Sequence, residues 1–175
     1  MRRIVLVVLS LCAATAACGR RPGAFPPPEQ RSLNLGKDPE GLQAFIAMDD
    51  PKVDDYIVRD ISPERGVFRW TFVNPELRLR VENNQNLKFT MEFAIPQVTF
   101  KVTGPVTVSC AINGHPLASM YCPRADKYTL EKPVPAEWVE ARTPIHVTFH
   151  AEPRWVSPAD GEQLSFLLFN AGFVQ

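Results

Sequence analysis

Alternation of apolar and polar residues constrains the fold of this chain more than any other feature. From residue 86 to residue 95 the sequence reads Asn-Leu-Lys-Phe-Thr-Met-Glu-Phe-Ala-Ile. Successive side chains of a β-strand point to opposite faces, so this pattern predicts a strand with one buried and one solvated face. The buried face is expected to hold Leu87, Phe89, Met91, Phe93 and Ile95.

The same period of two recurs along most of the chain beyond residue 55. Turn-forming residues, many of them prolines, separate the alternating segments, and almost no helical period is present. The pattern predicts an all-β fold, an antiparallel β-sandwich, with Val98, Phe100 and Val102 facing inward in one of its strands. The further strands are expected at 56–59, 67–73, 77–81, 97–103, 106–112, 115–121, 128–131, 145–151 and 164–174. Helical turns are expected only at 42–48 and 135–139.

The N-terminus has the features of a secretory signal peptide. Two arginines, Arg2 and Arg3, precede an apolar stretch that begins at Ile4 and is followed by small residues. The apolar stretch is about 14 residues long, whereas a helix that spans a bilayer needs roughly 20. Residues 1–17 are therefore predicted to be a cleaved signal peptide.

The end of this leader, Thr15-Ala16-Ala17-Cys18, resembles the lipobox of bacterial lipoproteins. The resemblance implies that Cys18 becomes the acylated N-terminus and anchors the protein to a membrane, since each buried methylene of an acyl chain contributes about 0.8 kcal/mol. Gly19 in the next position resembles the residue found in lipoproteins sorted to the outer membrane. The alternative is an ordinary secreted protein with an incidental cysteine in its signal.

Residues 18–41 are rich in proline and polar side chains and have no apolar period. We expect this segment to be a partly extended linker between the lipid and a single β domain at residues 42–175. That length suits one domain with one core. The chain carries 19 basic and 19 acidic side chains, so it lacks the basic surface expected of a nucleic-acid-binding protein.

No sequence motif for catalysis or for a cofactor is present. His146 and His150 lie four residues apart, which on a strand separates them by about 13 Å, too far to share one metal ion. The acidic residues Asp49, Asp50, Asp54 and Asp55 fit a solvated turn better than a calcium loop. Glu64 and Glu92 fit surface charge better than a pair of glycosidase carboxylates.

Cys110 and Cys122 are the cysteines that remain in the mature domain besides Cys18. An oxidising compartment favours a disulfide, but Asn113-Gly114 predicts a two-residue hairpin that pairs Ile112 with His115 and Cys110 with Leu117. That register places Cys122 about 17 Å from Cys110 and on the opposite face, whereas a disulfide needs Cα atoms within about 7 Å. Both thiols are expected to be free.

The three tryptophans are expected to play different roles. Trp70 alternates with Phe68 and Phe72, which predicts a core stripe with Arg69 pointing outward, and Trp138 is expected to close one end of the core. Trp155 lies in a proline-flanked loop with Arg154 and Asp160 nearby, and these three are the predicted ligand-binding residues. In the alternative interpretation, Trp155 folds over the edge of the core.

Several short segments resemble the jelly-roll, carbohydrate-binding-like β-sandwich domains of bacterial envelope proteins. They are Glu64 before Arg69-Trp70-Thr71, the Asn113-Gly114 hairpin, the Pro-Val-Pro segment that ends at Trp138, and Pro158-Ala159-Asp160-Gly161. The resemblance spans roughly residues 56–175 and implies a jelly-roll-like fold.

These observations predict a non-enzymatic, lipid-anchored protein of the cell envelope, in the outer membrane and facing the periplasm or the surface. Its β domain is expected to bind a glycan, by analogy of fold. One alternative is an assembly partner of an envelope protein complex, and another is a hydrolase without a recognisable motif. No cofactor and no metal ion are expected.

Overall fold

The computed structural model describes residues 41–175. The predicted signal peptide, Cys18 and the linker up to residue 40 lie outside the described residues. The strands are β1 (Phe45–Ala47), β2 (Ile57–Ile61), β3 (Arg69–Arg80), β4 (Lys88–Ala94), β5 (Val106–Ile112), β6 (His115–Cys122), β7 (Lys127–Pro133), β8 (Pro144–Glu152), β9 (Trp155–Val156), β10 (Gln163–Leu164) and β11 (Leu167–Val174). The helical segments are η1 (Val53–Asp55), α2 (Gln97–Thr103) and η2 (Ala136–Trp138).

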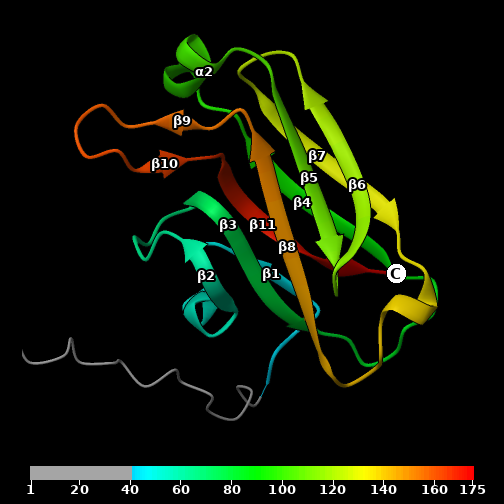
Figure 1. The fold of residues 1–175 in the computed structure, drawn as a ribbon. Helices are drawn as coiled ribbons and strands as arrows, with labels where there is room; N and C mark the ends of the chain where they lie inside the picture. Colours follow the sequence, from blue (N-terminus) through cyan, green and yellow to red (C-terminus); the bar gives the residue numbers. More distant parts are fainter. Residues whose placement is uncertain (1–40) are drawn as a thin grey trace, which may run out of the picture. The chain divides into compact units, whose positions relative to one another are not determined.

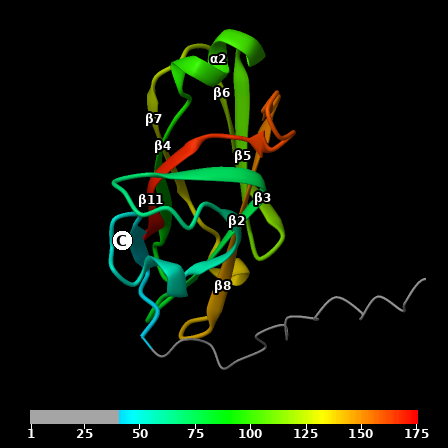
Figure 2. The same ribbon diagram turned by 90° about the vertical axis from the view of Figure 1, so that its left-hand side faces the viewer.

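The fold is mostly antiparallel β-sheet, which confirms the predicted all-β class. Nine strands form one sheet in the order β6-β5-β8-β3-β11-β4-β7, with β1 paired to β11 and β2 paired to β3. The sheet curls until its two halves face each other (Figures 1 and 2). Strands β9 and β10 form a separate two-stranded hairpin.

The long strand β3 connects the two halves of the sheet. Its first residues, Arg69 and Trp70, pair with β11, and its last five residues pair with β8. The core lies between the halves, where the ring of Phe149 on β8 lies 6.3 Å from that of Phe89 on β4 and 6.2 Å from that of Phe166. These aromatic contacts across the interior hold the curled sheet together.

The predicted alternation is confirmed where it is most regular. Leu87, Phe89, Met91, Phe93 and Ile95 are all buried. The same holds for Leu77, Leu79 and Val81 and for Ile145, Val147 and Phe149. The helical turn expected at 135–139 is present as η2. Among residues 41–175, no helix is long and apolar enough to cross a membrane.

The strand predicted at 97–103 is wrong, because this segment forms α2. Pro96 lacks the N–H group that a strand would use, and its carbonyl accepts from the Thr99 hydroxyl at 3.0 Å. Gly104, with φ of 70°, ends the helix. Val98 and Val102 are therefore 63% and 72% exposed instead of facing inward.

The helical turn predicted at 42–48 is also wrong, because this segment contains strand β1. Gly172 on β11 makes the pairing possible, since a Cβ atom there would collide with the backbone of Ala44 and Phe45. The Phe173 N–H donates to the Ala44 carbonyl at 2.7 Å. Ile46 and Met48 are buried as a result.

The side-chain orientation predicted at the start of β3 is inverted. Arg69 and Thr71 are 1% and 0% exposed, whereas Phe68 is 40% exposed and Trp70 and Phe72 are half-buried. The odd-numbered residues face inward at both ends of β3, although its pairing with β2 is irregular between Thr71 and Glu76. Trp70 therefore lies on the outer face of the sheet.

Candidate functional site

A hollow lies beside the start of β3, where the loop between β2 and β3 folds back on the strand. Its volume is about 250 Å³. The lining residues are Ser62, Glu64, Arg65, Gly66, Val67, Phe68, Arg69 and Trp70. Loops on a rigid scaffold are where binding residues concentrate.

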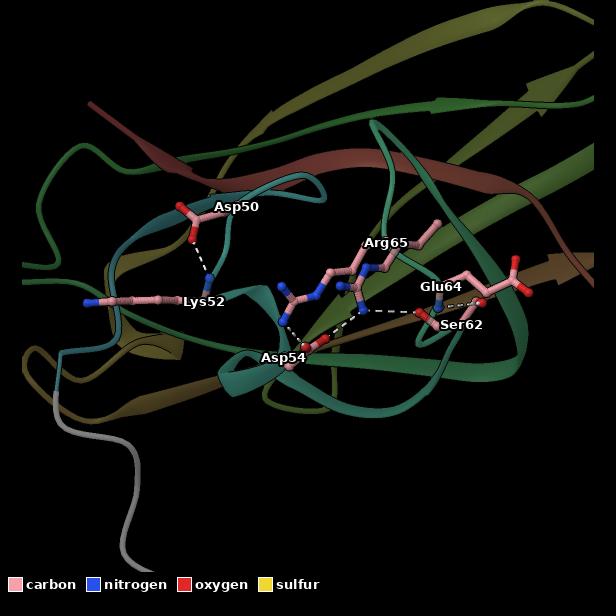
Figure 3. Close-up of polar contacts among 7 residues, drawn as sticks. Asp50, Lys52, Asp54, Ser62, Glu64 and Arg65 are labelled. Carbon is pink, nitrogen blue, oxygen red and sulfur yellow. Dashed lines mark hydrogen bonds and ion pairs between the residues drawn. The ribbon is translucent and has the colours of Figure 1, made fainter.

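An ion-pair network fixes the shape of this loop (Figure 3). Arg69 Nη1 donates to Asp54 Oδ1 at 2.7 Å and to the Ser62 carbonyl at 3.1 Å. Arg65 Nη2 donates to the other oxygen, Asp54 Oδ2, at 3.2 Å. The hydrogen bond from Arg69 is the main cause that lowers the pKa of the Asp54 carboxyl below its usual range. Asp54 therefore joins η1 to the middle of the loop and to the first residue of β3.

Arg69 is a positioning residue in this arrangement. Its side chain is fully buried, while Asp54 is 52% exposed. Within the described residues, Nε and Nη2 of Arg69 have no hydrogen-bond partner. A buried guanidinium is costly unless it is paired, so Asp54 holds the first residue of β3 in place. Because these nitrogen atoms are enclosed, Arg69 itself offers no group to solvent, and only the residues around it do.

The groups that face solvent here combine aromatic rings with charge. Phe68 and Trp70 lie at period two on the outer face, and the Phe68 ring lies 5.6 Å from that of Phe169. The Glu64 side chain is exposed, and within residues 41–175 its carboxylate has no ion pair or hydrogen bond. The rings of Phe68 and Trp70 are on the outer face, next to the free carboxylate of Glu64. Such a surface suits a ligand that has both apolar faces and hydroxyl groups.

The predicted ligand residues Trp155, Arg154 and Asp160 all lie on the β9–β10 hairpin but do not converge. Trp155 is half-buried and pairs with Leu164. Arg154 Nε donates to Gln163 Oε1 at 3.1 Å. Asp160 lies in the turn at the tip, where it accepts from the Glu162 N–H at 3.0 Å, and a hydrogen bond from Ser157 lowers its pKa. Ligand binding by these residues stays a prediction.

The other charged candidates are engaged in pairs. Asp50 accepts from the Lys52 N–H at 2.7 Å (Figure 3). Glu92 bonds Lys127 at 3.1 Å and Asn170 at 2.8 Å, and the first of these is the main cause that lowers its pKa. Across residues 41–175, no three His, Cys, Asp or Glu side chains are grouped closely enough to hold a metal ion.

The two histidines lie on the solvent face of β8. His146 Nδ1 lies 2.7 Å from Glu76 Oε1, and the other oxygen of Glu76 binds Arg59 at 2.8 Å. His150 Nε2 lies 3.8 Å from Glu152 Oε2. Each histidine thus has its own carboxylate neighbour.

The cysteines are both free and buried, and burial raises the pKa of each thiol to about 11. Asn113 and Gly114 have φ of 48° and 81°, and Ile112 pairs with His115 as predicted. A bulge next to Cys110 then pairs it with Ala118 instead of Leu117. Cys122, opposite Val106, therefore lies on the same face as Cys110, which corrects the predicted opposite face, and about 13 Å further along.

The sequence prediction missed Asp54 and Arg69 as a structural pair and placed Trp70 in the core. The signal that could have found them is the phase of β3, since Leu77 and Leu79 fix which residues face inward. Trp138, expected to close one end of the core, is half-buried and stacks on His115 with ring centroids 5.0 Å apart.

No protein-family model matches this chain, and no curated protein matches its sequence.

Proposed function

We propose that this chain is a lipid-anchored protein of the cell envelope whose β domain is a non-enzymatic binding module for a glycan. The observation that carries the proposal is the outward-facing aromatic pair Phe68 and Trp70 beside the exposed carboxylate of Glu64. Aromatic faces stack on the apolar faces of sugar rings, while charged side chains bind the hydroxyl groups.

The proposal includes a jelly-roll-like β-sandwich as the finer class of the fold. Its support is the packing of Phe89 against Phe149 across the interior and the pairing of β3 with strands of both halves. Two facing antiparallel sections with a shared core are typical of such domains.

The anchor in this proposal is Cys18, which lies outside the described residues. Its support is the resemblance of Thr15 to Cys18 to a lipobox. Cys18→Ser should release the protein from the membrane fraction, and the wild-type protein should incorporate labelled palmitate. Absence of label, or a mature N-terminus at another residue, contradicts the anchor.

The glycan site is tested by comparing two tryptophans. The full chain is screened on a glycan array, and binding of the best ligand is measured by calorimetry for Trp70→Ala, Trp70→Phe and Trp155→Ala. We expect Trp70→Ala to abolish binding and Trp70→Phe to retain part of it, because the phenyl ring still stacks. Loss in Trp155→Ala alone would instead place the site on the β9–β10 hairpin.

Glu64→Gln tests the polar half of the site. The carboxylate has no structural partner in the described residues, so the variant should keep the melting temperature of the wild type and weaken glycan binding. If no glycan binds the wild-type protein, the proposed ligand class is wrong.

One observation favours the second candidate function, an assembly partner in an envelope complex. Val98 and Val102 on α2 and Val156 on β9 are more than half exposed, and α2 lies beside β9 (Figure 1). Exposed apolar patches mark protein contacts. Pull-down from an envelope extract with wild type and Val102→Glu tests this candidate.

A further inference from the structure

Strand β6 is an open end of the sheet. Within residues 41–175 it pairs only with β5, and β7 at the other end pairs only with β4. An end strand has unpaired N–H and C=O groups along its free side, which can pair with another strand.

The two end strands differ in charge. β7 contains Lys127, Glu131 and Lys132, and charged residues on an end strand discourage pairing with another chain. β6 reads His-Pro-Leu-Ala-Ser-Met-Tyr-Cys and contains no Asp, Glu, Lys or Arg. An identical copy of β6 can therefore lie beside it without bringing like charges together.

β6 also carries a hollow and a projecting ring. The hollow, about 450 Å³, is lined in part by Pro116, Leu117 and Ala118, next to the bulge that displaces this strand from β5. Tyr121, toward the other end of β6, is 64% exposed. Ser119 also lines the hollow and stands between Leu117 and Tyr121 on the strand.

We propose that β6 is a self-association surface, at which two copies of this chain pair antiparallel about a two-fold axis through Ser119. A two-fold axis normal to the sheet keeps the outer faces of both copies on one side, so Ser119 lies opposite Ser119 of the second copy. In this register Tyr121 lies opposite Leu117 of the second copy, and each ring covers the hollow of the other copy.

The dimer is expected to be weak and dependent on concentration. Specific interfaces bury roughly 1,200–2,000 Å², whereas this contact consists of one pair of eight-residue strands with two tyrosine rings. This inference does not depend on the glycan or on the lipid anchor.

The test introduces a positive or a negative charge at Ser119, on the two-fold axis. The dimer is measured by sedimentation of the full chain in detergent. Ser119→Lys and Ser119→Glu should each weaken the dimer at least about tenfold, because like charges directly opposite each other on paired strands repel. An equimolar mixture of the two variants should restore it. Thr129→Lys, an equivalent change on β7, should leave the dimer intact.

A second readout is cross-linking of Ser119→Cys, whose introduced thiols lie opposite each other in this register. The variant should form a disulfide-linked dimer under mild oxidation, and the wild type, whose Cys110 and Cys122 are buried, serves as the control. A wild-type chain that stays monomeric at every concentration overturns the proposal. So does a mixture of the Lys and Glu variants that does not restore the dimer.

Discussion

The two halves of β3 bury very different side chains at equivalent positions. The half that pairs with β8 places Leu77 and Leu79 in the core, whereas the half that pairs with β11 places Arg69 and Thr71 there. In both halves the odd-numbered residues face inward. The difference teaches that the direction in which a position faces decides whether its residue is buried. Polar residues are tolerated there when they are hydrogen-bonded, as Thr71 is, or paired with an opposite charge, as Arg69 is with Asp54.

The largest expected loss of stability is in the half of β3 that pairs with β8. Leu79 is fully buried, so Leu79→Ala should lower the free energy of unfolding by about 2.7–5 kcal/mol. Trp70→Ala removes more atoms but from the outer face, and it should cost less. Urea denaturation of both variants checks the order, and a larger loss for Trp70→Ala would mean that the tryptophan is in the core after all.

In the half of β3 that pairs with β11, removing Asp54, the partner of the buried Arg69 charge, should lower the free energy of unfolding the most. Asp54→Ala leaves Arg69 buried and unpaired, with an expected loss of about 3 kcal/mol. Arg69→Met removes the charge itself and leaves Asp54 exposed and paired with Arg65, so it should cost less. Equal losses in thermal unfolding would argue against a buried, unpaired guanidinium as the cause.

A smaller effect is expected at Thr71. Its hydroxyl donates to the Phe166 carbonyl at 2.8 Å and accepts from the Phe166 N–H at 3.1 Å. Thr71→Val keeps the shape but leaves that buried N–H without its partner, which should cost about 1–3 kcal/mol. Thr71→Ser retains the hydroxyl and is the control. The idea fails if the serine variant is the less stable of the two.

The smallest expected effect is a dependence of the protein's stability on pH. Hydrogen bonding to Arg69 is the main cause that lowers the pKa of Asp54 from its ordinary 3.8. A lowered pKa in the folded state stabilises the protein above pH 3.8, and this stabilisation is lost as the pH falls through the folded-state pKa. The wild type should lose stability below that pH more steeply than Arg69→Met. Parallel curves from denaturation across this range would contradict the assignment.

The sequence predicted the parts of the fold in which hydrophobicity and strand phase agree. In β4 and β8 the apolar residues occupy every inward position, and those strands are as predicted. At residues 97–103 the same period of two misled, because a proline and a glycine at the ends of the segment decide its structure locally. The alternation of Val98, Phe100 and Val102 with polar residues does not override these ends.

The candidate site was harder to predict than the fold. The aromatic residues Phe68, Trp70 and Phe72 look like a core stripe when the first half of β3 is read alone. Only pairing with β11 and continuity with Leu77 reverse that interpretation. The ion pair between Asp54 and Arg69 joins residues 15 positions apart through a loop, and no local pattern indicates such a contact.

The central place of β11 in the sheet has a consequence for folding. β11 pairs with β1, β3 and β4, so it completes the middle of the sheet. Each of these partners lies far from β11 in the sequence, and distant pairings of this kind form slowly because a long loop must close first. The early strands therefore wait, with their edges unpaired, until one later segment reaches all three of them.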